Sequence, residues 1–157
     1  MKRNNMPIII KKNIPLLYSK SDMIVVPVHV NNNNQTSWNK YPIKDIKQRY
    51  PLAYAHFRRL QDAGLVEHGV PVVSSGVESK EICWLPIATD FRREYKIKWI
   101  ARGLRNMNSM RLHHDYTIAF PALGAYESDG VDPIAVYKIA LRYFSNCENT
   151  FEYLTNY

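Results

Sequence analysis

The chain has 157 residues, of which 46% are hydrophobic, and carries a formal net charge of +7 with a pI near 9.4. This length predicts one domain over residues 1–157 with a full core, and this composition excludes a disordered chain. No apolar run approaches the roughly 20 residues of a membrane helix, and the run from Pro7 to Ile10 is too short for a signal-peptide core. We therefore expect a cytoplasmic protein without membrane contact.

Cysteine and histidine give no sign of a metal centre. Cys83 and Cys147 are too few and too far apart for a disulfide framework or a cysteine zinc site. His113 and His114 are adjacent, so their side chains point apart, and no third ligand accompanies them. The sequence therefore predicts neither a metal nor a cofactor.

The predicted strands are near-continuous apolar runs, and polar segments separate them. In chain order they cover residues 8–11, 23–30, 71–74, 81–87, 117–123 and 150–154. Runs of this kind indicate strands that are covered on both faces, as in a parallel sheet. Residues 31–35, Asn-Asn-Asn-Asn-Gln, are too polar to pack and predict a loop. Ser74-Ser75-Gly76 matches no nucleophile motif and predicts a turn.

Helical periodicity appears in three places between these strands. Residues 43–60 carry apolar side chains at spacings of three and four, and Pro51 interrupts that helix or begins a second one. The second helix covers about residues 95–107. The third covers residues 133–144, where Asp132 suits the N-cap and Pro133 the first helical position. The aligned apolar residues of this third helix are Ile134, Tyr137, Leu141 and Phe144.

Strands that alternate with helices indicate an α/β fold with a mostly parallel sheet. The strand at 117–123 contains Pro121 and runs to Gly124, a polar loop follows, and a helix begins at Asp132-Pro133. In an open α/β sheet, small ligands bind in the crevice beyond the carboxyl ends of such strands. The N–H groups at the start of the next helix favour phosphate there. The segment therefore predicts a nucleotide-like pocket.

Several short motifs follow the order of a known family. They are Lys12-Asn13-Ile14, Val25 to His29, Ile46 to Pro51, Leu85-Pro86, Phe91-Arg92, Trp99 to Leu104, Ala119 to Gly124, and Gly130-Val131-Asp132. With these motifs the chain resembles the macro domain, the ADP-ribose-binding fold, over roughly residues 8–153. It is most similar to antitoxins that remove ADP-ribose from DNA, and to phosphatases and deacetylases that act on ADP-ribose derivatives. The resemblance implies a three-layer α/β/α domain with a mixed, mostly parallel sheet of about six strands.

The resemblance also implies a set of ligand-binding residues. Asn13 stands where the family contacts adenine, and Gly124, Ser128 and Gly130 belong to the diphosphate loop. Phe91 and Tyr126 stack on adenine or cover a ribose, or else pack within the protein. Arg92 contacts a phosphate or the solvent.

The chain departs from the family where catalysis is expected. His29 replaces the family's asparagine, Ala88 replaces its catalytic lysine, and residues 30–41 contain no glycine. Alanine cannot move a proton, and a loop without glycine cannot approach a ribose closely. Glu127 and Asp129 add negative charge near the expected diphosphate, at a cost of about 4 kcal/mol for charges 4 Å apart.

Three functions remain open on these grounds. The first is a catalytically impaired binding or adaptor module for a protein partner or an ADP-ribose-like ligand, such as a phage or viral protein uses in the host cytoplasm. The second is an active ADP-ribose hydrolase or phosphatase with His29 as its catalytic residue. The third is nucleic-acid binding by the basic helix over residues 92–111, where aromatic residues lie among the cations. The alternative for that helix is that its cations form a solvent-exposed face and bind no ligand.

Overall fold

The computed structural model describes residues 8–12, 16, 19–29, 43–67, 69–76, 79–88, 93–109, 116–121, 133–144 and 150–155. Its strands are β1 (Ile8–Lys12), β2 (Met23–His29), β3 (Val72–Ser74), β4 (Glu81–Ala88), β5 (Thr117–Pro121) and β6 (Thr150–Thr155). Its helices are α1 (Ile43–Arg49), α2 (Pro51–Asp62), α3 (Arg93–Ser109) and α4 (Pro133–Phe144). All six predicted strands are present, with described bounds that differ from the predicted ones by at most two residues, and the predicted ends at 30 and 122–123 lie outside the described residues.

The strands form one mixed sheet in the order β1-β6-β5-β2-β4-β3. The pairs β1–β6, β5–β6, β2–β5 and β2–β4 are parallel, and β3 pairs with β4 in the antiparallel sense. The prediction of a mixed, mostly parallel sheet is confirmed.

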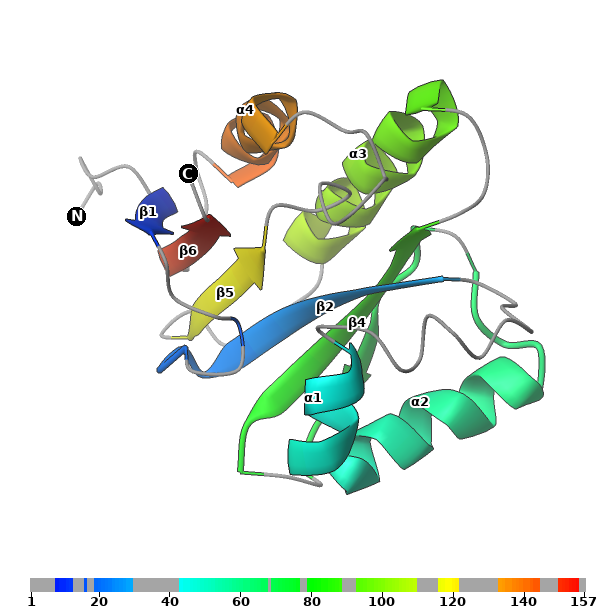
Figure 1. Ribbon diagram of the computed structural model, residues 1–157. Helices are drawn as coiled ribbons and strands as arrows, with labels where there is room; N and C mark the ends of the chain where they lie inside the picture. The colour runs from blue at the N-terminus through cyan, green and yellow to red at the C-terminus, as the bar shows by residue number, and fades with distance from the viewer. Residues whose placement is uncertain are drawn as a thin grey trace.

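The helices cover both faces of this sheet and complete three layers (Figure 1). Helices α1 and α2 lie on one side of the sheet, and α3 and α4 lie on the other. Successive strand residues point to opposite faces. Val25 and Cys83 accordingly pack with α3 and α4, whereas Ile24 and Ile82 pack with α1 and α2. The predicted three-layer α/β/α architecture is therefore confirmed.

Pro51 begins a second helix rather than bending one long helix. It is the first residue of α2, and the main-chain N–H groups of Tyr50 and Tyr54 bond to Ile46 and Tyr50 across the junction. The predicted apolar face is buried at Ile46, Tyr50, Ala53 and Phe57. The Phe57 ring stacks on Trp84 of β4 at a centroid distance of 5.0 Å.

Helix α4 has its predicted bounds but packs through a different face. Val136, Ala140 and Phe144 are fully buried, whereas Ile134 is 63% exposed. Tyr137 and Leu141 are only partly buried. Ile134 therefore lies outside the buried face, although the sequence pattern aligns it with Phe144. Residues at spacings of four, beginning at Val136, meet the sheet instead.

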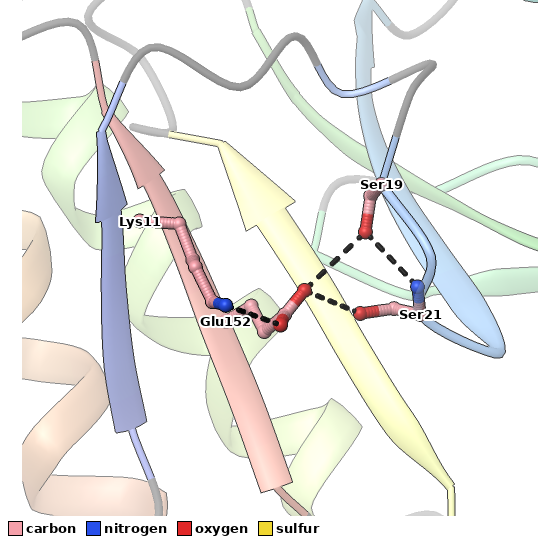
Figure 2. A network of polar contacts seen from close by, with 4 residues as sticks. All are labelled: Lys11, Ser19, Ser21 and Glu152. Carbon is pink, nitrogen blue, oxygen red and sulfur yellow. Dashed lines mark hydrogen bonds and ion pairs between the residues drawn. The ribbon is translucent and has the colours of Figure 1, made fainter.

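A polar network attaches the β1–β2 connection to the sheet (Figure 2). Glu152 of β6 accepts hydrogen bonds from the Ser21 hydroxyl at 2.7 Å and the Ser19 hydroxyl at 3.4 Å. The Ser19 hydroxyl also accepts the Ser21 main-chain N–H at 3.1 Å. Lys11 of β1 lies 3.8 Å from the same carboxylate. These contacts attach Ser19 and Ser21, which precede β2, to Glu152 of β6 on the face opposite α3 and α4.

Candidate functional site at the carboxyl ends of β2 and β5

The chain leaves the two central strands β2 and β5 in opposite directions. From β2 it continues through α1 and α2 on one face toward β3 and β4. From β5 it continues through α4 on the other face to β6. Such a reversal of strand order is a topological switch point, where open α/β sheets bind ligands. The switch point lies beside the strand that the sequence singled out, residues 117–121.

The ladder between β2 and β5 is short. Within the described strands it holds the pairs Met23–Ile118 and Ile24–Ala119, although β2 continues to His29. Beyond Ile24, β2 is paired with β4. Pro27, the register partner of Leu85 in β4, lies in this part of β2 and has no N–H to donate. Within the described parts of the two strands, β2 and β5 therefore separate after Ile24 and Ala119.

A register shift distinguishes the end of β2. Val28 pairs with Pro86, but the next residue, His29, pairs with Ala88, so that one residue of β4 is skipped. Irregularities of this kind bend a strand and redirect its side chains, often beside functional sites. The shift makes neighbours of the two positions at which the family resemblance implies asparagine and lysine, namely His29 and Ala88.

Most of the other sequence-predicted site residues lie outside the described residues. The structure places His29 as the last residue of β2, at the carboxyl end of the sheet, and describes its backbone alone. The ligand-binding candidates outside the described ranges are Asn13, Phe91, Arg92, Gly124, Tyr126, Ser128 and Gly130. The histidine pair at 113–114 and Cys147 fall outside these ranges as well.

The structure contains a second polar cluster that the sequence did not reveal. At the amino ends of β2, β4 and β5, a cavity of about 400 Å³ is lined by charged and hydroxyl side chains, among them Asp22, Lys80, Glu81 and Tyr116. Sequence reasoning missed it because its residues come from three connections that lie far apart in the sequence, β1–β2, β3–β4 and α3–β5, and none belongs to a motif.

Hydrogen bonds within the chain engage the charged groups of this cluster. The Lys80 ammonium donates to the main-chain oxygens of Ser19 and Ser21, the latter at 2.7 Å. Partial burial lowers the pKa of Lys80 from its ordinary value. The Tyr116 hydroxyl donates to Glu81 at 3.1 Å, and that bond raises the pKa of Tyr116. These contacts join the starts of the strands and give the cluster a structural role.

A serine–histidine pair between α2 and β3 is also structural. The Ser74 hydroxyl lies 2.7 Å from His56 Nδ1 and accepts the Trp84 indole N–H at 3.0 Å. Ser74 is only 1% exposed, so a substrate cannot reach its oxygen. The predicted turn at this place begins after Ser74, which is the last residue of β3.

The described part of the chain holds no group of three or more side chains that could bind a metal ion. Among its helices, none combines the length and the apolar character needed to cross a membrane.

No family model and no curated protein matches this sequence. Solved structures do match its fold. The macrodomain of Thermus aquaticus DarG is 18% identical, with a TM-score of 0.74 over 94% of this chain and 97% of that chain. The macrodomain of Mycobacterium tuberculosis DarG is 19% identical, with a TM-score of 0.72 over 92% of this chain and 97% of that chain.

A mutant Oceanobacillus iheyensis macrodomain, solved with ADPR, is 15% identical and has a TM-score of 0.72. That match covers all of this chain and 90% of the other chain. The sheet order, the two helical layers and these three matches agree with the family that the motifs indicated: the chain has the macro-domain fold.

Proposed function

We propose that this protein is a binding module for ADP-ribose or a nucleotide-like ligand, and that its hydrolytic activity is impaired. The observation that carries the proposal is the separation of β2 and β5 after Ile24 and Ala119 at the switch point of a macro-domain fold. A neighbour with this fold was solved with ADPR. The ligand would lie beyond the carboxyl ends of these two strands.

The residues proposed to hold the ligand come from the segments that follow the strands. Asn13 follows β1 and would accept a hydrogen bond from the adenine amino group. Gly124, Ser128 and Gly130 lie between β5 and α4, where main-chain N–H groups would bind the diphosphate. Phe91, Arg92 and Tyr126 would add stacking and charge.

The proposed impairment of catalysis rests on two neighbouring positions. His29 and Ala88 are register partners, so the residues that replace the family's asparagine and lysine stand side by side. Alanine supplies neither a proton nor a positive charge to a leaving group. Of these two residues, His29 alone has a side chain that can exchange a proton near neutral pH.

Calorimetry with ADP-ribose tests the binding. We expect saturable heat, and a Gly130→Val variant should weaken binding about tenfold or more because its side chain blocks the approach of the diphosphate to the main chain. Lys20→Ala, an exposed position just before β2, serves as the control and should bind normally. The absence of heat at millimolar ligand would refute the proposed ligand class.

A turnover assay with ADP-ribosylated DNA and with ADP-ribose 1″-phosphate tests the impairment. We expect no turnover above the uncatalysed rate. Turnover that disappears in His29→Ala would instead establish an active hydrolase or phosphatase, the main alternative.

A second candidate function is favoured by the exposed side of α3. Lys98, Arg102 and Arg105 recur at spacings of four and three, and all three are exposed. Cations on one helical stripe attract the phosphates of a nucleic acid. Binding to single-stranded DNA that weakens steeply with salt, and further in Lys98→Glu, would support this function. A flat salt response would exclude it.

A further inference from the structure

We propose that the β1 edge of the sheet is a docking site for an extended, acidic segment of a partner protein, which adds to the sheet as a further strand. This inference is independent of the proposed ligand site. It rests on the position of β1, on the exposure of its isoleucines and on the charge around it.

The two edges of the sheet differ in how they are protected. At one edge β3 has only three residues, and all of them are buried or half-buried. A short edge strand offers little to another chain. At the other edge β1 has five residues and pairs with β6 on one side. Alternate residues of such a strand direct their N–H and C=O groups away from the sheet, so that an extended peptide can pair with them.

The side chains of β1 make this edge apolar on both faces. Ile9 is 45% exposed and Ile10 is 48% exposed, and consecutive residues point to opposite sides of the sheet. Ile10 pairs with Tyr153, whose ring stacks on Tyr137 of α4 at 5.6 Å. Ile134 lies one turn before Tyr137 and is 63% exposed. Exposed apolar side chains therefore occur on both β1 and α4, which lie at the same end of the sheet (Figure 1), and the buried Tyr153 packs between these two elements.

The positive charge on β1 and α4 indicates that the partner segment is acidic. The sequence of β1 ends in two lysines, and α4 exposes Lys138 and Arg142. The nearest carboxylate in the described network, Glu152, already accepts the Ser21 hydroxyl at 2.7 Å (Figure 2). Lys11 lies 3.8 Å from it with 42% of its side chain exposed.

An acidic segment complements this surface, whereas β1 of a second copy carries lysines and no carboxylate and would add positive charge to an edge that is already basic. The preferred occupant is therefore a strand with branched apolar residues opposite Ile9 and Ile10 and with carboxylates opposite Lys11 and Lys12. Antiparallel pairing is slightly the more stable arrangement.

The probe is a fluorescent, end-blocked peptide of two glutamates followed by three valines, carried on a polar glycine–serine tail. We expect saturable anisotropy with the full chain, and an affinity that falls as salt is raised. Ile10→Lys should weaken binding about tenfold or more, because the apolar contact that it removes outweighs the weak, solvent-screened attraction that an exposed lysine adds. Leu65→Lys, at a position that is 67% exposed outside this edge, is the matched control and should bind normally.

If Ile10→Lys does not fold, a second experiment exchanges the charges of the peptide and of Lys11 and compares the binding. A second peptide carries lysines in place of the glutamates. Wild type should prefer the acidic peptide, and Lys11→Glu should reduce or reverse that preference without loss of the thermal transition.

Three results would overturn the proposal. The first is equal binding of the acidic peptide by wild type and a folded Ile10→Lys. The second is a wild-type dimer in sedimentation that Ile10→Lys dissociates, because the occupant is then a second copy. The third is binding only after removal of residues 1–6, because the edge then belongs to this chain's own amino-terminal segment.

Discussion

Gly69 illustrates how one loop residue can connect two elements, β4 and α3. Its N–H donates to the main-chain oxygen of Pro86 in β4 at 2.8 Å, and its own oxygen accepts the Asn106 side-chain amide of α3 at 2.6 Å. Its φ is +76°, and a Cβ placed on it would lie 2.9 Å from the Arg102 side chain. Both the backbone conformation and the available space therefore favour glycine.

We predict that Gly69→Ala destabilises the protein more than Gly64→Ala. Gly64 has a φ of +72°, but a Cβ placed on it would have nothing within 4 Å. Gly64→Ala should therefore lower the free energy of unfolding by about 1 kcal/mol, through backbone strain alone. Gly69→Ala must also displace Arg102, for a total of about 2–3 kcal/mol. Urea unfolding of both variants measures the difference. Equal losses would mean that Arg102 moves aside without cost.

Cys83 links stability to pH. Complete burial raises the pKa of its thiol to about 12, from 9.0 in the unfolded chain. Between these two values the folded protein holds a proton that the unfolded chain releases, so stability falls as pH rises.

Relative to Cys83→Ala, wild type should lose up to about 1.4 kcal/mol more per pH unit above pH 9.0. Denaturant titrations at several pH values measure the two slopes. Parallel slopes would contradict the prediction. Because Lys80 and Tyr116 are unchanged in both proteins, their own titrations cancel in this comparison.

At the level of elements, the periodicity of the sequence predicted the type of nearly every segment. Apolar runs of four to eight residues became strands, and spacings of three and four became helices. The sequence pattern did not identify the buried face of helix α4, because this helix has apolar residues on several sides. They include Ile134, Val136, Tyr137 and Leu141. Such a sequence fits more than one buried face, and contact with Phe151 and Tyr153 of β6 selects among them.

The corrected face of α4 gives a direct prediction. Val136→Ala removes two methyl groups from a fully buried position and should cost about 1–2.5 kcal/mol, whereas Ile134→Ala should change stability by less than about 0.5 kcal/mol. Thermal melting of the two variants provides the comparison. A larger loss for Ile134→Ala would restore the face expected from the sequence.

For the molecule as a whole, one sheet divides two cores. Phe57 belongs to the core under α1 and α2, and Phe144 belongs to the core under α3 and α4, where it stacks on Phe151 at 4.0 Å. Because β2, β4 and β5 contribute side chains to both cores, neither core can persist without the sheet.

We therefore predict that Phe57→Ala and Phe144→Ala each cost about 3–5 kcal/mol and that each keeps a single unfolding transition. Circular dichroism and tryptophan fluorescence should give the same midpoint in each variant. Leu52→Ala, at a 60% exposed position on α2, is the control. Separate midpoints for the two probes would show that the two cores unfold independently.

The sequence by itself determined the order and type of the elements and the mostly parallel sheet, and it predicted a ligand crevice beyond the carboxyl end of the strand at 117–123. It could do so because apolar periodicity, proline and glycine act locally along the chain. Only the tertiary structure decided that β2 and β5 separate after Ile24, that His29 is set beside Ala88, and that β1 leaves two isoleucines exposed at an edge. These features depend on which strands become neighbours and in what register, and that choice follows from packing between residues far apart in sequence.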